Sequence, residues 1–186
     1  MILIHIVSQC LMSVRDVAII IVECIWKQNI QKIKQLKELG KTATLSALLR
    51  PQSIEKDAAG NYKKFENESE VCDLLRAIDG SQEDENIFSF LNYDKIKEGE
   101  MCHHMVFVLP YRASCDAMQE LITNNPKKFD NLSQYEIINI AGVDGNTLYP
   151  SVETIKSKIK RCERDGKKTI TLTVNRMLTG NTVEEW

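Results

Sequence analysis

The second half of the chain alternates between short β-branched segments and longer amphipathic ones, and this order constrains the fold more than any other feature. Residues 105–109, 135–141 and 169–174 are predicted strands, and residues 113–124 and 151–164 between them are predicted helices. Strands separated by helices of this length favour a parallel sheet with right-handed crossovers. We therefore expect an α/β fold, a parallel sheet with flanking helices, over residues 101–186.

Polar turns follow all three predicted strands. Tyr111 and Arg112 follow the first strand, residues 142–145 follow the second, and Asn175, Arg176, Thr179 and Gly180 follow the third, which has the alternation of a buried central strand. Ligands of open α/β sheets bind outside the carboxyl ends of the strands, so these turns are candidates for a ligand-binding edge. Ordinary connections also use polar turns, and the pattern fits that simpler interpretation as well.

Residues 1–100 are predicted to form a mainly helical region with a soft boundary near residue 100. A long helix is expected over about residues 13–39, and a second helix is expected to begin at Asn67 or Ser69 and to end at Gly80. No apolar run reaches the ~18 residues of a membrane helix, and the charges near the N-terminus are misplaced for a signal peptide. The sequence thus predicts a cytoplasmic protein without a membrane partner.

The six cysteines lack the paired spacing that zinc or dithiol chemistry needs, so they are expected to be reduced and mostly buried. Cys102, His103 and His104 resemble a ligand cluster. Neighbouring strand residues point to opposite faces, however, so no metal site is expected there.

The net charge of −2 gives no overall attraction to nucleic acid, so any polyanion site must be a local patch. The candidate is the predicted helix at 151–164 and the residues after it, where basic side chains outnumber acidic ones; they are Lys156, Lys158, Lys160, Arg161, Arg164, Lys167 and Lys168. The same residues also fit a solvated helix face.

Two segments of the second half resemble a known family. The run HMVFVLPYRASCDAMQELI is similar to helicase motif IV with its following helix, and TITLTVNRMLTGNTVEEW is similar to motif V, both in the second RecA-like domain of superfamily 2 helicases. The likeness is greatest to the helicase or translocase subunits of type I and type III restriction-modification systems. It implies a RecA-like, P-loop NTPase-type C-terminal lobe over about residues 102–186.

The resemblance also implies roles for single residues. Thr179 and Gly180 match the motif V core that approaches the nucleic-acid backbone, and Arg176 and Asn175 lie beside it. Tyr111 and Arg112 match the end of motif IV, and Lys160 and Arg164 are further candidates for phosphate contacts. Gly180 and Thr182 occupy the positions implied to sense the nucleotide, although Thr182 stands where many relatives have an acidic residue.

The sequence motifs that a helicase motor needs for ATP hydrolysis are absent from this sequence. Gly40, Lys41 and Thr42 end like a Walker A loop, but Gln35 occupies the position of the first glycine, and no DEAH-like box or motif VI is found. We therefore expect an incomplete lobe whose ATP and Mg²⁺ belong to the full-length motor. The implied partners are DNA, the missing first RecA-like lobe and methyltransferase or specificity subunits.

Two other classes of function stay open at this level. One is a stand-alone α/β binding or scaffold module, in which the basic helix and its rim recruit a partner or nucleic acid without any motor. The other is a small enzyme with Ser114 or Cys115 as the nucleophile, for which the sequence offers no assignable histidine and acid partner.

Overall fold

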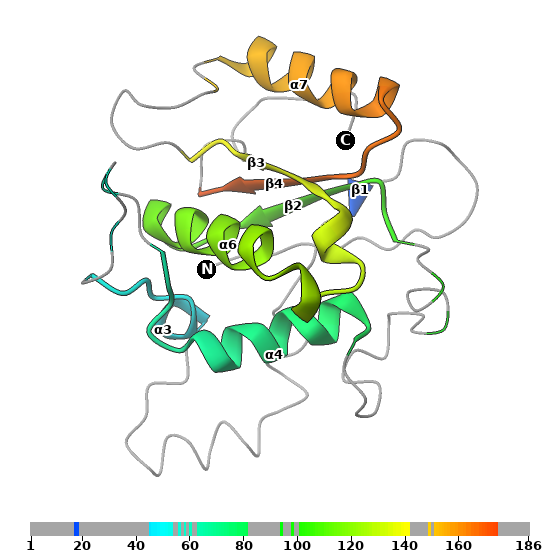
Figure 1. Cartoon of the computed structure of the whole chain (residues 1–186). Coiled ribbons are helices and arrows are strands. Elements are labelled where there is room, and N and C mark those ends of the chain that lie inside the picture. The colour runs from blue at the N-terminus through cyan, green and yellow to red at the C-terminus, as the bar shows by residue number, and fades with distance from the viewer. Residues whose placement is uncertain are drawn as a thin grey trace.

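The computed structural model describes residues 17–18, 45–53, 56, 58, 60, 63–81, 94, 98, 101–141, 149 and 151–174 of the 186-residue chain. These residues include a parallel sheet of four strands in the order β1-β2-β4-β3. The strands are β1 (Val17–Ala18), β2 (His104–Val108), β3 (Glu136–Asn139) and β4 (Thr169–Thr173). β2 and β3 both pair in parallel with β4, so the three predicted strands lie side by side and point the same way (Figure 1).

Helices cover both faces of the sheet. α6 (Arg112–Asn124) connects β2 to β3 together with two short 3-10 helices, η1 (Pro126–Lys128) and η2 (Leu132–Gln134), and α7 (Val152–Arg164) connects β3 to β4. Figure 1 shows α6 on one side of the sheet and α7 on the other. The first connection moves across the sheet and the second moves back, so their placement on opposite faces gives both the same hand, as the crossover rule requires.

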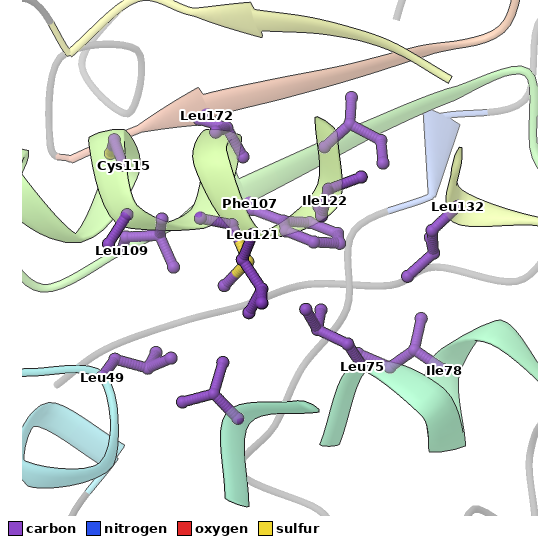
Figure 2. Packing of buried hydrophobic residues seen from close by; sticks show 14 of the residues in the cluster. Leu49, Leu75, Ile78, Phe107, Leu109, Cys115, Leu121, Ile122, Leu132 and Leu172 are labelled. Carbon is purple, nitrogen blue, oxygen red and sulfur yellow. The ribbon is translucent and has the colours of Figure 1, made fainter. Parts of the chain in front are cut away.

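The face of the sheet under α6 carries the larger hydrophobic core. Phe107 from β2 and Leu172 from β4 point toward Leu121 and Ile122 of α6 in one buried cluster (Figure 2). These residues are 0–3 % exposed. Alternation along the strands explains the pattern, because every second residue of each strand faces this helix.

A second helix, α4 (Glu68–Asp79), contributes to the same core from the far side of α6. Leu75 and Ile78 of α4, together with Leu49 just after the short helix α3 (Leu45–Leu48), belong to the cluster that contains Phe107 and Leu172 (Figure 2). α4 ends at Gly80, which has a left-handed backbone conformation with φ of 76° that favours glycine. The predicted helix and its stop are therefore confirmed, while the domain boundary near residue 100 stays a prediction.

The opposite face of the sheet is covered by α7 through a smaller apolar cluster. Ile138 and Ile140 of the β3 segment pack against Ile155 and Ile159 of α7, and all four are at most 1 % exposed. Ser151 begins α7 with a reciprocal capping box, in which its hydroxyl accepts from the Thr154 amide and its own amide donates to the Thr154 hydroxyl. The helix therefore starts where the sequence predicts.

One expectation about the N-terminal half is wrong where the structure describes it. Val17 and Ala18 lie within the predicted helix 13–39, but they pair in parallel with His104 and Met105 as strand β1. The apolar run that begins at Val17 is rich in β-branched residues, which favour a strand as readily as a buried helix. The other residues of that predicted helix lie outside the described part of the chain.

Candidate nucleic-acid interface

The carboxyl ends of the three main strands meet at one edge of the sheet, which we call the carboxyl edge. The amide of Leu109 donates to the carbonyl of Thr173 at 2.7 Å, and the amide of Ile140 donates to the carbonyl of Leu172 at 3.0 Å. The chain therefore leaves β2, β3 and β4 at the same level. This is the position at which open α/β sheets bind ligands.

Tyr111 and Arg112 lie at this edge, between the end of β2 and the start of α6. Tyr111 is 41 % exposed and stands out among the large hydrophobic side chains of the described residues. Its backbone is extended, and no side chain caps the first turn of α6 among the residues that the structure describes. Arg112, the first residue of the helix, is also exposed. An exposed ring next to a guanidinium offers a stacking surface and a phosphate partner together.

A polar pair that the sequence interpretation missed holds α6 against β3 beside this edge. The Asn139 side chain donates to Oδ1 of Asp116 at 2.8 Å and accepts from the amide of Ala141 at 3.2 Å. Asp116 lies one turn after Arg112 on α6, so this bond fixes the start of the helix relative to the sheet. The available signal was the polar Asn139 directly after two isoleucines in the predicted strand.

The remaining residues predicted for this edge come after Val174. Asn175, Arg176, Thr179, Gly180 and Thr182 lie outside the described residues, so their roles stay predictions. The structure does establish where that segment departs, because Thr173 is bonded to Leu109 at the carboxyl edge.

Lys160 and Arg164 do not belong to the same edge. α7 runs back from the carboxyl ends of the strands to the start of β4, so Arg164 lies near the opposite edge, which we call the amino edge (Figure 1). A five-residue strand separates the two edges by roughly 16 Å at about 3.3 Å per residue. Of the predicted nucleic-acid residues that the structure describes, Tyr111 and Arg112 therefore lie on a different part of the surface from Lys160 and Arg164.

The amino edge holds a histidine with two polar partners. Nδ1 of His104 lies 2.8 Å from the hydroxyl of Thr169, and Nε2 lies 3.3 Å from Oε1 of Glu163. Burial lowers the pKa of His104, and the hydrogen bond and charge of Glu163 oppose that shift. Hydroxyl, imidazole and carboxylate are in the order of a nucleophile, base and acid, but Thr169 is 0 % exposed. This cluster therefore joins α7 to the sheet and cannot meet a substrate.

Ser114 and Cys115, considered above as nucleophiles, are equally inaccessible. Both are 0 % exposed, and the Ser114 hydroxyl donates to the carbonyl of Leu49 at 2.6 Å. Burial strongly raises the pKa of the Cys115 thiol, which keeps it protonated and unreactive. The interpretation as a small enzyme with either residue as its nucleophile is therefore wrong.

The four cysteines in the described part of the chain are free, and Cys72, Cys115 and Cys162 are buried as predicted. His103 is exposed while its neighbour His104 is buried, so the two histidines do not converge on one point. Within the described ranges no three metal-ligating side chains gather, and no helix there has the length and apolar character needed to cross a bilayer.

Comparison with known proteins gives one informative relative. The chain is 25 % identical over 141 residues to a Mycoplasma pneumoniae protein described as "Putative type II restriction enzyme and methyltransferase RM.MpnORF110P C-terminus". The match covers 75 % of this chain but only 18 % of that protein. No protein-family model and no solved structure matches. The sequence is thus related to a protein of a restriction-modification system, and the chain spans about a fifth of that relative's length.

Proposed function

We propose that this chain contributes the second RecA-like lobe of a DNA helicase or translocase in a restriction-modification system. In this role the carboxyl edge contacts DNA. Tyr111 stacks on a base, Arg112 pairs with a phosphate, and the segment containing Asn175, Arg176, Thr179 and Gly180 continues the contact along the backbone.

The observation that carries the proposal is the parallel arrangement of β2, β4 and β3. It places the residues after motif-IV-like β2 beside the departure point of the motif-V-like segment, as a lobe that reads DNA with both motifs requires. The relation to a restriction-modification protein supports the same setting.

The chain does not offer a complete ATP site, and we assign it no step of hydrolysis. Phosphate binding in such motors needs a glycine-rich loop that ends in lysine, and this sequence has none with the required spacing. We assign ATP and Mg²⁺ to the full-length motor. The purified chain is expected to show no ATPase activity with or without DNA. Reproducible DNA-stimulated turnover that Arg176→Ala abolishes would contradict the assignment.

DNA binding by the whole chain tests the proposed edge. A fluorescent single-stranded 20-mer is titrated at several salt concentrations, and binding is followed by anisotropy. Arg112→Gln is expected to weaken binding and to reduce the log-log salt slope by about 0.7, the value for one phosphate of a single strand. Tyr111→Ala is expected to weaken binding roughly 5- to 150-fold without changing the slope, because a stacked base contributes about 1–3 kcal/mol.

Two variants serve as matched controls. Tyr111→Phe keeps the ring and should bind as the unaltered chain does. Lys127→Gln removes an exposed charge in η1, beyond the other end of α6, and should leave the slope unchanged. Equal effects of Arg112→Gln and Lys127→Gln would count against a specific edge, and absence of binding at low salt would favour the scaffold interpretation.

A further inference from the structure

The charges of α7 and the turn after it divide into an inner and an outer set. Residues 156–168 contain seven basic and two acidic side chains, a net charge of +5, so the rest of a chain with net charge −2 carries −7. Positive charge is therefore concentrated in this segment of a slightly acidic protein. The direction of each side chain determines whether its charge is paired within the fold or faces the solvent.

The inner set attaches α7 to the sheet. Glu136 of β3 accepts from Lys158 at 2.6 Å and lies 3.6 Å from Lys167. The hydrogen bond from Lys158 is the main reason why the pKa of Glu136 is lowered. Lys168 lies 5.7 Å from the ring centre of Tyr135. Two basic residues of the segment therefore share one carboxylate, and a third lies over an aromatic ring.

One of the two acidic residues of the segment is directed toward the sheet. Glu163 is hydrogen-bonded to buried His104 at 3.3 Å, which draws its carboxylate toward the sheet. Asp165 caps the C-terminus of α7 through its backbone amide, and its side chain is exposed. The outward surface therefore keeps a net positive charge, with four basic side chains against the exposed Glu163 and Asp165.

The outer set consists of Lys156, Lys160, Arg161 and Arg164, which we call the α7 cationic face. Lys160, Arg161 and Arg164 are exposed, and Lys156 is partly exposed. Lys156, Lys160 and Arg164 follow one another at four-residue intervals, or about 6 Å along the helix axis. Successive phosphates of one DNA strand advance by about 3.4 Å along the duplex axis, so every second phosphate lies about 7 Å further on, close to the spacing of this row.

We propose that the α7 cationic face is a second nucleic-acid surface, which holds the phosphate backbone of duplex DNA on the side of the sheet opposite α6. It lies toward the amino edge and is separate from the carboxyl edge. The proposal goes beyond the motor function and does not depend on it, because its evidence is the charge and position of α7 alone. It also predicts no sequence preference, since phosphate contacts carry none.

Duplex binding by the whole chain tests this surface. A fluorescent 20-base-pair duplex is titrated between 50 and 200 mM salt with the unaltered chain and with the triple variant Lys160→Gln, Arg161→Gln, Arg164→Gln. Three phosphate contacts at a slope of about 0.9 each account for roughly a 40-fold loss of affinity over this range. The triple variant should bind more weakly at 50 mM and lose about 2.7 from the slope.

A charge-matched variant separates this surface from net charge. Arg76→Gln, Lys127→Gln, Lys128→Gln removes three positive charges from a pocket between α4 and η1, on the other side of the sheet, and should keep nearly the unaltered slope. Equal losses in both triple variants would overturn the proposal, as would an unchanged slope in the α7 variant. Salt-sensitive binding of poly-glutamate without duplex binding would also overturn it and would identify an acidic protein as the occupant.

The result of the duplex test on α7 can be distinguished from the result of the single-strand test on the carboxyl edge. Loss of single-strand binding in Arg112→Gln reports on the motor proposal, and loss of duplex slope in the α7 variant reports on this one. Circular dichroism of each variant checks that the fold is retained.

Discussion

Replacing the buried Asp79 should destabilise the protein more than any surface substitution, because its carboxylate joins α4 to the segment that leads into β3. Asp79 is 0 % exposed. Its oxygens accept hydrogen bonds from three successive backbone amides, those of Asp130, Asn131 and Leu132, at 2.8, 2.9 and 2.6 Å. In addition, the Asn131 side chain donates to the Asp79 carbonyl at 2.9 Å.

The size of the effect follows from these bonds. A hydrogen bond to a charged group contributes about 1.5–3 kcal/mol and a neutral one about 0.5–1.5 kcal/mol. In Asp79→Asn two bonds become neutral and the third amide faces an NH₂ group, which at the lower end of these ranges gives a loss of about 3.5 kcal/mol. In Asp79→Ala all three amides lose their acceptor, and the loss rises to about 4–5 kcal/mol. Either loss is a large share of the ~5–15 kcal/mol by which folded domains are stable.

Urea unfolding followed by circular dichroism measures these losses. The expected result is a lower midpoint with an unchanged slope, which indicates a change in stability and not in the denatured state. Asp130→Asn removes the same charge from an exposed neighbour and should stay within about 0.5 kcal/mol of the unaltered chain. A loss below about 1 kcal/mol for Asp79→Asn would refute the reasoning.

Two further predictions concern the face of the sheet covered by α7. Because burial lowers the pKa of His104 from its usual 6.5, the unfolded chain takes up the proton first as pH falls. Stability should therefore be complete above about pH 6.5 and decline below it toward the folded pKa. Urea unfolding midpoints measured across pH 5–8 should show this decline in the unaltered chain. The decline should be smaller in His104→Gln and should be retained in the control His103→Gln. Ser151→Ala removes the hydroxyl that accepts from Thr154 and should cost about 1 kcal/mol by urea unfolding, while Ser157→Ala in the middle of the same helix should be nearly neutral.

The parallel sheet could be predicted from the sequence because the signals for its strands are local. Residues 169–174 alternate in a β-branched run, and β4 occupies Thr169–Thr173 at the centre of the three main strands. β1 could not be predicted, because a two-residue strand is defined by its pairing with His104 and Met105 and not by its own periodicity. Long-range pairing decides such short segments.

The long-range polar contacts between elements could not be predicted from the sequence either. Asp79 meets amides 51–53 residues later in the chain, and His104 meets Glu163 at a separation of 59 residues. Neither contact leaves a periodic signal. The candidate site shows the same division: Tyr111 and Arg112 were found from their position after a strand, whereas the bond between Asn139 and Asp116 needed the folded arrangement.

The most direct test of the proposed role is to find which end of α6, and so which edge of the sheet, touches DNA. A photoreactive benzoylphenylalanine placed at position 111 of the whole chain is irradiated with a labelled single strand, and the same residue at exposed position 123 serves as the control. Thr123 lies twelve residues further along, at about 1.5 Å per helical residue, near the other end of α6. Cross-links from position 111 alone are the predicted result. Equal cross-linking from both positions, or cross-linking from position 123 alone, would contradict a DNA-binding carboxyl edge.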